Sequence, residues 1–249
     1  MNMLPARSIL LAALGLAVAG AMAPAAVAGI AISPVVIEMA SPRQAVAVKV
    51  TNNGDTAITL QSDIFTWRQI DGVNHDEPTN ELLVVPPIVE VAARASQVFR
   101  IMLRAPTPLP LERTYHLLLE DITKAQTQDG ASQLTFTMNH LLPILIAPTG
   151  KIIAAARWKP CAAINSAPIA GQACVRLQNA GNRRIKVQAL TLAGAGWQQT
   201  LTLPAGINVL AGAERVWQVP LLEGHTGNVH AVQVRTAHDK TLEAATGGF

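Results

Sequence analysis

Short runs in which apolar and polar residues alternate follow one another along the chain from residue 29 onward. Clear examples are AVAVKV at 45–50, SQVFRIMLR at 96–104 and NVHAVQVRT at 228–236. A period of two is the pattern of a β-strand with one buried face, whereas helical periodicity is nearly absent. The chain is therefore predicted to be all-β, with strands packed into immunoglobulin-like sandwiches.

The two halves of the chain repeat one style of sequence. TNNGD at 51–55 and QNAGN at 178–182 each resemble the turn after the second strand of a sandwich. APTGK at 147–151 has the composition of a hinge. About 220 residues remain after the N-terminal segment, which suits two domains of ordinary size. We predict two immunoglobulin-like domains in tandem, at 29–148 and 151–249.

The first 28 residues have the layout of a secretory signal peptide. Arg7 gives a positive start, an apolar stretch follows at 8–24, and AVA at 26–28 fits the small-residue cleavage rule. We predict cleavage after Ala28, with an uncleaved membrane anchor as the alternative. No later apolar stretch is long enough to span a membrane, so an exported, soluble product without membrane insertion is expected. The formal net charge of +3 is too small to indicate a nucleic-acid partner.

Cys161 and Cys174 are the only cysteines, and they lie close together in the sequence. A disulfide that closes a short loop is the expected state in an exported protein. Such a bond stabilises a fold by about 3 kcal/mol in the chain-entropy account. A metal site is the alternative, but no histidine or second cysteine pair stands at ligand spacing.

The sequence contains no recognisable catalytic motif. GxSxG, HExxH, the Walker phosphate loop and GxGxxG are all absent, and the six histidines are scattered. Glu120 and Asp121 have no second acidic cluster beside them for acid–base work, and we expect them to form ion pairs between the domains instead. We predict a protein that is not an enzyme and that uses no cofactor or metal. A hydrolase or metal protein with an unrecognised site is the remaining alternative.

One run, QLTFTMNHLLPILIAP at 133–148, is less ordinary than the others. Its large residues recur at every second position and would line one face of a strand. They are Leu134, Phe136, Met138, His140 and Leu142. Taken alone, such a strand either closes its own sandwich or completes the sheet of another polypeptide.

Five segments carry a resemblance to a known family. They are ISPVVIEM at 32–39, VKVTNNGDTAITLQSDIFTWRQIDG at 48–72, ELLVVPPIVEVAARASQVFRIMLR at 81–104, ERTYHLLLEDI at 112–122 and LTFTMNHLLPILIAP at 134–148. Together they resemble the N-terminal domain of PapD-like periplasmic chaperones of pilus assembly, especially the archaic, Csu-type branch that serves spore-coat-U-like pili. The resemblance is weaker in the second domain. It implies an L-shaped pair of domains in the periplasm.

The same resemblance implies how the chain works. A chaperone of this family donates a strand to an incomplete pilus subunit and delivers that subunit to an outer-membrane usher. The donor strand here would be 133–147, and Leu134, Phe136, Met138, His140 and Leu142 would enter the subunit's groove. Leu141, Ile144 and Ile146 would pack in the chain's own core. Because the donor strand is sticky, we also expect that free molecules can self-associate.

Typical members of this family hold the subunit's C-terminal carboxylate with an Arg in the first strand and a Lys in the donor strand. Val36 and Pro143 stand at those positions here, so neither side chain can bind an anion. The candidates for a replacement anchor are Arg100, which we take as the main one, His116, Arg113 and Lys151. The alternative function is a structural or adhesive immunoglobulin-like pilus component that exchanges strands between copies of itself.

Overall fold

The structure is a computed structural model that describes residues 29–40, 45–105, 108–123, 138–161, 171–225, 228–237, 240–247 and 249. All regular structure in these residues is β, as expected. The strands are β1 (Ile30–Ser33), β2 (Ile37–Met39), β3 (Ala45–Asn52), β4 (Ile58–Ile70), β5 (Val73–Pro78), β6 (Leu82–Val85), β7 (Ile88–Val91), β8 (Ser96–Leu103), β9 (Arg113–Asp121), β10 (His140–Ile146), β11 (Ala156–Pro160), β12 (Gln172–Asn179), β13 (Ile185–Gly194), β14 (Trp197–Val209), β15 (Glu214–Pro220), β16 (Val229–Thr236) and β17 (Thr241–Thr246).

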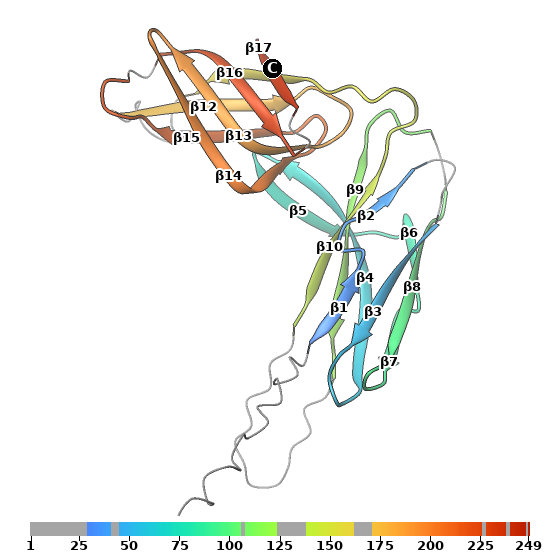
Figure 1. Ribbon diagram of the computed structural model, residues 1–249. Helices are drawn as coiled ribbons and strands as arrows, with labels where there is room; N and C mark the ends of the chain where they lie inside the picture. Colours follow the sequence, from blue (N-terminus) through green and yellow to red (C-terminus); the bar gives the residue numbers. More distant parts are fainter. Residues whose placement is uncertain are drawn as a thin grey trace, which may run out of the picture.

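Strands β1 to β10 and their loops form an N-terminal unit, which is a sandwich of two sheets (Figure 1). One sheet has the order β1-β3-β8-β6, and the other has the order β2-β10-β9-β4-β5 with β7 also paired to β4. The first segment of the chain serves both sheets, since β1 pairs with β3 and β2 pairs with β10. Phe99 and Tyr115, from opposite sheets, are fully buried between them. The peptide bonds before Pro34 and Pro86 are cis.

Strand β10 is paired unequally along its two edges. On one side it pairs with β9 along its full length, from His140 to Ile146. On the other side β2 pairs with it in parallel, but only at Ile144, Leu145 and Ile146. Among the described residues, the outer edge of β10 before Ile144 therefore has no partner strand.

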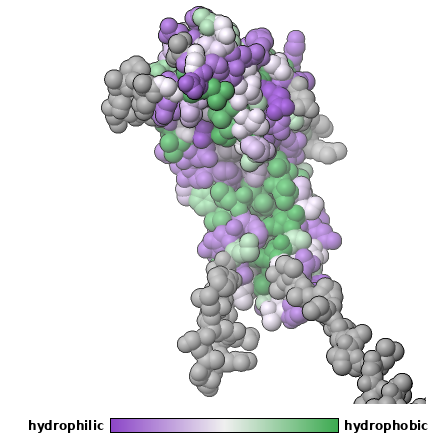
Figure 2. Space-filling model, turned by 60° about the vertical axis from the view of Figure 1, so that its left-hand side comes forward, coloured by the Kyte–Doolittle hydropathy of each residue, from purple (hydrophilic) through white to green (hydrophobic). Residues whose placement is uncertain are grey.

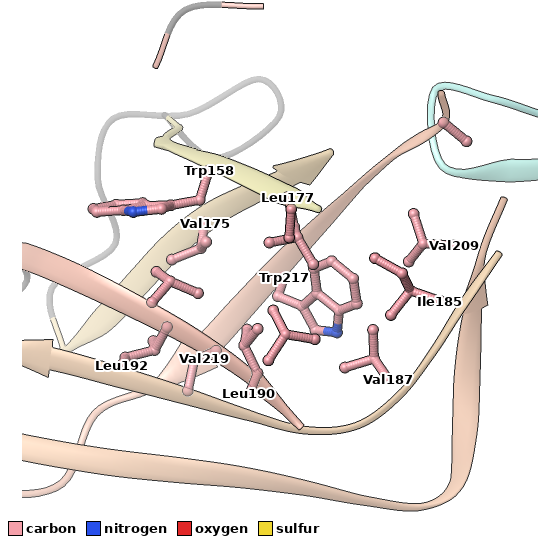
Figure 3. Packing of buried hydrophobic residues seen from close by; sticks show 14 of the residues in the cluster. Trp158, Val175, Leu177, Ile185, Val187, Leu190, Leu192, Val209, Trp217 and Val219 are labelled. Atoms are coloured by element: carbon pink, nitrogen blue, oxygen red, sulfur yellow. The ribbon is translucent and has the colours of Figure 1, made fainter. Parts of the chain in front are cut away.

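Strands β11 to β17 form a C-terminal unit in which the hydrogen-bonded order is continuous: β14-β13-β16-β17-β11-β12-β15. Its core is rich in tryptophan. Trp217 lies among Leu177, Val187 and Leu190, and Trp158 lies farther along the same core (Figure 3). Cys161 and Cys174 form the expected disulfide, 13 residues apart in the sequence. The division of the chain at residues 148 and 151 stays a prediction.

The two echoing turns place a buried asparagine at the same point of each unit. Asn52 is 2% exposed, and its side-chain amide donates to the backbone carbonyls of Thr56, Val91 and Ala92. Its Oδ1 atom accepts a hydrogen bond from the amide of Gly54 at 2.9 Å. One side chain thus ties its own turn to the strand β7 and the loop after it.

Asn179 does the same in the C-terminal unit. It is fully buried, donates to the carbonyls of Arg183 and Val209, and accepts from the amide of Gly181 at 3.0 Å. The turn leaves no room for a side chain at Gly181, because a Cβ atom there would lie 2.3 Å from the carbonyl oxygen of Ile153.

The C-terminal unit lies across one end of the N-terminal unit, so that the molecule is bent (Figure 1). Trp67, near the end of the long strand β4, and Leu145, in β10, are buried in the hydrophobic cluster of the C-terminal unit. Gln69 donates to the carbonyl of Asn208 at 3.0 Å and accepts from the amide of Leu210 at 2.9 Å. The long hairpin of β4 and β5 therefore joins the two units.

Candidate functional site

Within the described residues the predicted donor segment starts at Met138, which is 64% exposed. Leu141 is 50% exposed, whereas Ile144 and Ile146 lie in the N-terminal core as expected. Leu142 differs from the expectation because it is 7% exposed and belongs to the same core. The cause is the period of two: Leu142 shares the inward face with Ile144 and Ile146, and Leu141 points outward. Leu142 is therefore a core residue of its own sandwich in this conformation.

The rest of the predicted donor face lies toward the beginning of the segment. Leu134 and Phe136 lie outside the described residues. His140 is partly exposed, and its Nε2 atom is buried without a hydrogen-bond partner among the described residues. Met138 and His140 share the inward parity of Leu142, but Met138 precedes the first paired residue of β10. Along this face the side chains thus change from buried in the chain's own core, at Leu142, to exposed on the surface, at Met138.

Exposed hydrophobic side chains are concentrated in the N-terminal unit. Among the described residues, fifteen large hydrophobic side chains are exposed. Twelve of them lie in the N-terminal unit and only one, Leu222, lies in the C-terminal unit. Figure 2 shows hydrophobic side chains gathered over the N-terminal unit, below a mostly hydrophilic C-terminal unit. Val35 and Val36 belong to this set and directly precede β2, beside the open edge of β10. Exposed hydrophobic side chains that gather on one face of a protein are typical of an interaction site.

Arg100 lies on β8, in the sheet that does not contain β10. Its side chain is on the outer face of that sheet, between the exposed Val98 and Met102, and opposite Ala47 and Val85 in the register. It forms no ion pair with any described residue.

His116 lies on β9, opposite Pro143 of β10. It is 8% exposed, its Nδ1 atom is 2.7 Å from Oδ1 of Asp76, and its ring stacks on Trp67 at 4.6 Å between centroids. The histidine is thus already engaged by a carboxylate at the junction of the two units.

Arg113 begins β9 and donates from Nη1 to Oε2 of Glu81 at 3.0 Å. The same carboxylate oxygen accepts a 2.6 Å hydrogen bond from the hydroxyl of Tyr115. Burial, followed by this hydrogen bond, raises the pKa of Tyr115 to about 12, although the charge of Arg113 acts in the opposite direction. Lys151 is exposed in the segment between the units. The four anchor candidates therefore lie in four different settings and do not form one cluster.

A network of charged side chains joins the two units, and no pattern in the sequence predicted it. The carboxylate of Glu112 is 1% exposed and accepts from Nε of Arg183 at 3.2 Å and from the backbone amide of Arg184 at 2.9 Å. Glu38 contacts both arginines, at 3.2 and 3.4 Å. Glu120, to which we gave such a role, instead faces Asn139 of its own unit. No local pattern pairs residues so distant, although the pair of arginines after the Asn179 turn was a visible signal.

The described part of the chain shows no sign of a metal site or of a membrane-spanning helix. No group of three or more His, Cys, Asp or Glu side chains is placed to hold a metal ion. No helix there is long and apolar enough to cross a membrane.

Comparison with protein families places the N-terminal unit. Residues 29–151 match the family of pili and flagellar-assembly chaperones, at its PapD N-terminal domain. This part of the chain belongs to the PapD-like pilus-assembly chaperones, which are binding proteins and not enzymes. A comparison with curated protein sequences gives no significant match.

Solved structures share the fold of nearly the whole described chain. A chain of the CsuC–CsuE chaperone–tip adhesion subunit pre-assembly complex, from archaic chaperone-usher Csu pili of Acinetobacter baumannii, has a TM-score of 0.66 at 16% identity, over 89% of this chain and all of that one. The Class 5 fimbriae chaperone CfaA has a TM-score of 0.63 at 13% identity, over 89% and 100%. The E. coli chaperone DraB has a TM-score of 0.56 at 16% identity, over 87% and 96%. At such identities the likeness shows a shared fold.

Proposed function

We propose that this protein is a periplasmic chaperone of the archaic type, which binds pilus subunits by donating the strand at 133–147. The subunit would be a sandwich that lacks one strand and therefore exposes both a sheet edge and an apolar groove. Strand donation covers both at once, because backbone groups complete the edge and alternate side chains fill the groove. The bound subunit is then delivered to an outer-membrane usher.

The observation that carries this proposal is the open edge of β10. Between His140 and Pro143 one side of the strand is paired with β9, and the other side has no partner strand among the described residues. Backbone groups of such an edge readily pair with another chain. The exposed side chains of Met138 and Leu141 flank the same edge.

The donated side chains are those that precede Leu142, which packs in the chain's own core. Met138 and His140, preceded by Leu134 and Phe136, would enter the subunit's groove, whereas Leu142 already serves the chain's own core. Burial of a Leu, Phe or Met side chain contributes about 1.5–3 kcal/mol. Several such groups, less the cost of ordering the segment, hold a subunit without an external energy source. Methionine also adapts to grooves of different shape.

The anchor for the subunit's terminal carboxylate is proposed among Arg100, His116, Arg113 and Lys151. The role would require His116 to leave Asp76 or Arg113 to leave Glu81, since both are already paired. Arg100 and Lys151 form no ion pair with a described residue, but Arg100 lies on the other sheet. If Arg100→Ala leaves the recovery of subunits from the periplasm unchanged, Arg100 is not the anchor.

The test is co-expression of this chain with a candidate pilus subunit, followed by purification of the complex. Met138→Glu places a charge in the groove, so capture of the subunit should be abolished while the melting temperature of the chaperone stays unchanged. Val73→Glu is a matched control, because Val73 is similarly exposed (59%, against 64% for Met138) but lies on β5, at the opposite edge of the same sheet. Retention of capture by Met138→Glu would reject the proposed donor strand.

The same experiment separates the alternative of a structural or adhesive pilus component. A chaperone gives a soluble complex of one chain with one subunit. A component that exchanges its strand between copies gives polymers of this chain alone, which size-exclusion chromatography distinguishes from the complex.

A further inference from the structure

Strand β14 lies at one end of the strand order of the C-terminal unit and forms an unusual sheet edge. It is 13 residues long, from Trp197 to Val209, and carries no charged side chain. The chain around it is neutral as well, since no Asp, Glu, Lys or Arg occurs from Val187 to Ala213. One side of β14 pairs with β13, and the other side has no partner strand among the described residues.

The other edge strands have features that hinder the addition of another chain. β1, β6 and β7 have four residues each, and β2 has three. β5 carries Asp76 and Glu77, and β15 carries Glu214 and Arg215. Short edge strands and charged side chains are the usual protection against pairing with another chain. Apart from the outer edge of β10, β14 is the only edge among the described strands that has neither.

The part of β14 that is free to pair is its first half. Residues 203–206 form a bulge that has no partner in β13. Pro204, inside this bulge, has no amide hydrogen to donate. Near the end of the strand, the side chain of Gln69 already donates a hydrogen bond to the carbonyl of Asn208. A second chain could therefore add to β14 along residues 197–202.

This half of β14 is complementary to a second copy of itself. Gln198, Thr200 and Thr202 are exposed on one face of the strand, and Leu201 is partly buried on the other. An antiparallel pair centred on Thr200 places Thr200 opposite its own copy and Gln198 opposite Thr202, with no charge against a like charge. Thr200 Oγ1 already lies 2.9 Å from Thr191 Oγ1 on β13, so a row of threonine hydroxyls would continue across the axis. Threonine pairs opposite each other stabilise neighbouring strands.

We propose that the protein forms a twofold-symmetric dimer in which the first halves of β14 from two copies pair antiparallel, with Thr200 on the axis. Such an interface uses the same surface of both copies, so it closes at two and does not lead to polymers. The inference goes beyond the proposed function and does not depend on it. The pairing uses no residue of β10, so each copy keeps its donor strand.

The first test is sedimentation equilibrium of the purified protein over a range of concentrations, which should show a reversible equilibrium of monomer and dimer. Thr200→Lys places two like charges opposite each other on the axis and should raise the dissociation constant of the dimer by about tenfold or more. Because Thr200 is exposed, the melting temperature should change little. Ala231→Lys is the matched control. It adds the same charge at an exposed position of β16, which has partner strands on both sides, and should leave the dissociation constant unchanged.

The second test traps the axis with a disulfide. Thr200→Cys adds a single free thiol, because the only natural cysteines, Cys161 and Cys174, are bonded to each other. Residues opposite each other in an antiparallel pair lie within the Cα spacing that a disulfide requires, so mild oxidation should link two copies. Ala231→Cys is the control and should stay unlinked.

The outcomes separate this dimer from the donor strand. A monomer at every concentration, or equal dissociation constants for the wild type and Thr200→Lys, would overturn the β14 dimer. If Met138→Glu dissociates the dimer and Thr200→Lys does not, self-association runs through the donor strand, and the β14 dimer is rejected while the proposed function stands. Thr200→Lys should capture a co-expressed pilus subunit as well as the wild type does, so the two proposals can fail independently.

Discussion

Asn52 and Asn179 occupy the same place in the two units and make nearly the same hydrogen bonds, yet the units differ in what they expose. The C-terminal unit runs through one continuous order of seven strands, is closed by a disulfide and exposes a single large hydrophobic side chain among its described residues. The N-terminal unit exposes twelve and leaves part of β10 unpaired on one side. Within the described residues, one unit is thus closed over its hydrophobic side chains, and the other is open along part of one sheet edge.

The charged contacts at the junction give the largest expected effect. Glu112→Ala leaves Arg183 and Arg184 without their buried carboxylate, and loss of one partner of a buried pair costs about 3–5 kcal/mol. Chemical denaturation of the variant should show this loss of unfolding free energy, and the two units should unfold separately. Asp55→Ala is the control, because its pair with Arg94 is exposed and should contribute less than about 1 kcal/mol. A small effect of Glu112→Ala would mean that the contacts of Trp67, Gln69 and Leu145 are sufficient to hold the two units together.

The second prediction compares a buried and an exposed residue of the same segment. Leu142→Ala removes a side chain from the N-terminal core and should cost about 2–4 kcal/mol of unfolding free energy. Met138→Ala removes an exposed side chain and should change that free energy by less than about 0.5 kcal/mol. Equilibrium unfolding in urea measures both. Equal costs for the two variants would show that Met138 is also buried in its own sandwich, which contradicts the open edge.

The third prediction tests whether the two asparagines are equivalent. Replacement of either by Ala leaves buried backbone carbonyls without a donor, so each variant should lose about 2–3 kcal/mol. The fluorescence of the tryptophans reports the C-terminal unit, because all four, including Trp67, lie in its cluster. Asn179→Ala should therefore shift the fluorescence transition more than Asn52→Ala does. Equal shifts would show that the two units unfold as one.

The fold was predictable because local patterns determine most of it. Period-two runs indicated the strands, and the echo of TNNGD in QNAGN indicated two related sandwiches. The disulfide followed from two neighbouring cysteines. Trp67, on strand β4 of the N-terminal unit, packs in the cluster of the C-terminal unit. A buried strand residue looks the same in a sequence whichever unit it packs against.

The candidate site was predictable only in part. The run around Met138 stood out because its apolar residues alternate. The residue at which this segment enters the core of its own sandwich could not be predicted from that alternation. Leu142 continues the alternation but already lies in the core, two residues before the pairing of β10 with β2 begins at Ile144. The cations at the junction were missed for a similar reason. Arg184 and Glu38 are 146 residues apart, and only the packing of the two units brings them together.

The smallest expected effect is a change with pH. It reports on the N-terminal unit alone, because Tyr115 is the only tyrosine of the chain. Its pKa, raised from an ordinary value near 10 to about 12, means that the folded state keeps the phenolic proton more firmly than the unfolded state does. The resulting stability is present in full below about pH 10 and is lost as the pH rises toward 12. The ultraviolet absorbance of the phenolate should therefore rise with a midpoint near pH 12, unless the unit unfolds first. Glu81→Gln removes a hydrogen bond that raises the pKa and should lower the midpoint, whereas Arg113→Gln should raise it. A midpoint at pH 10 in the wild-type protein would show that the Tyr115 side chain is accessible to solvent. The N-terminal unit would then be open at Tyr115 as well as along the outer edge of β10.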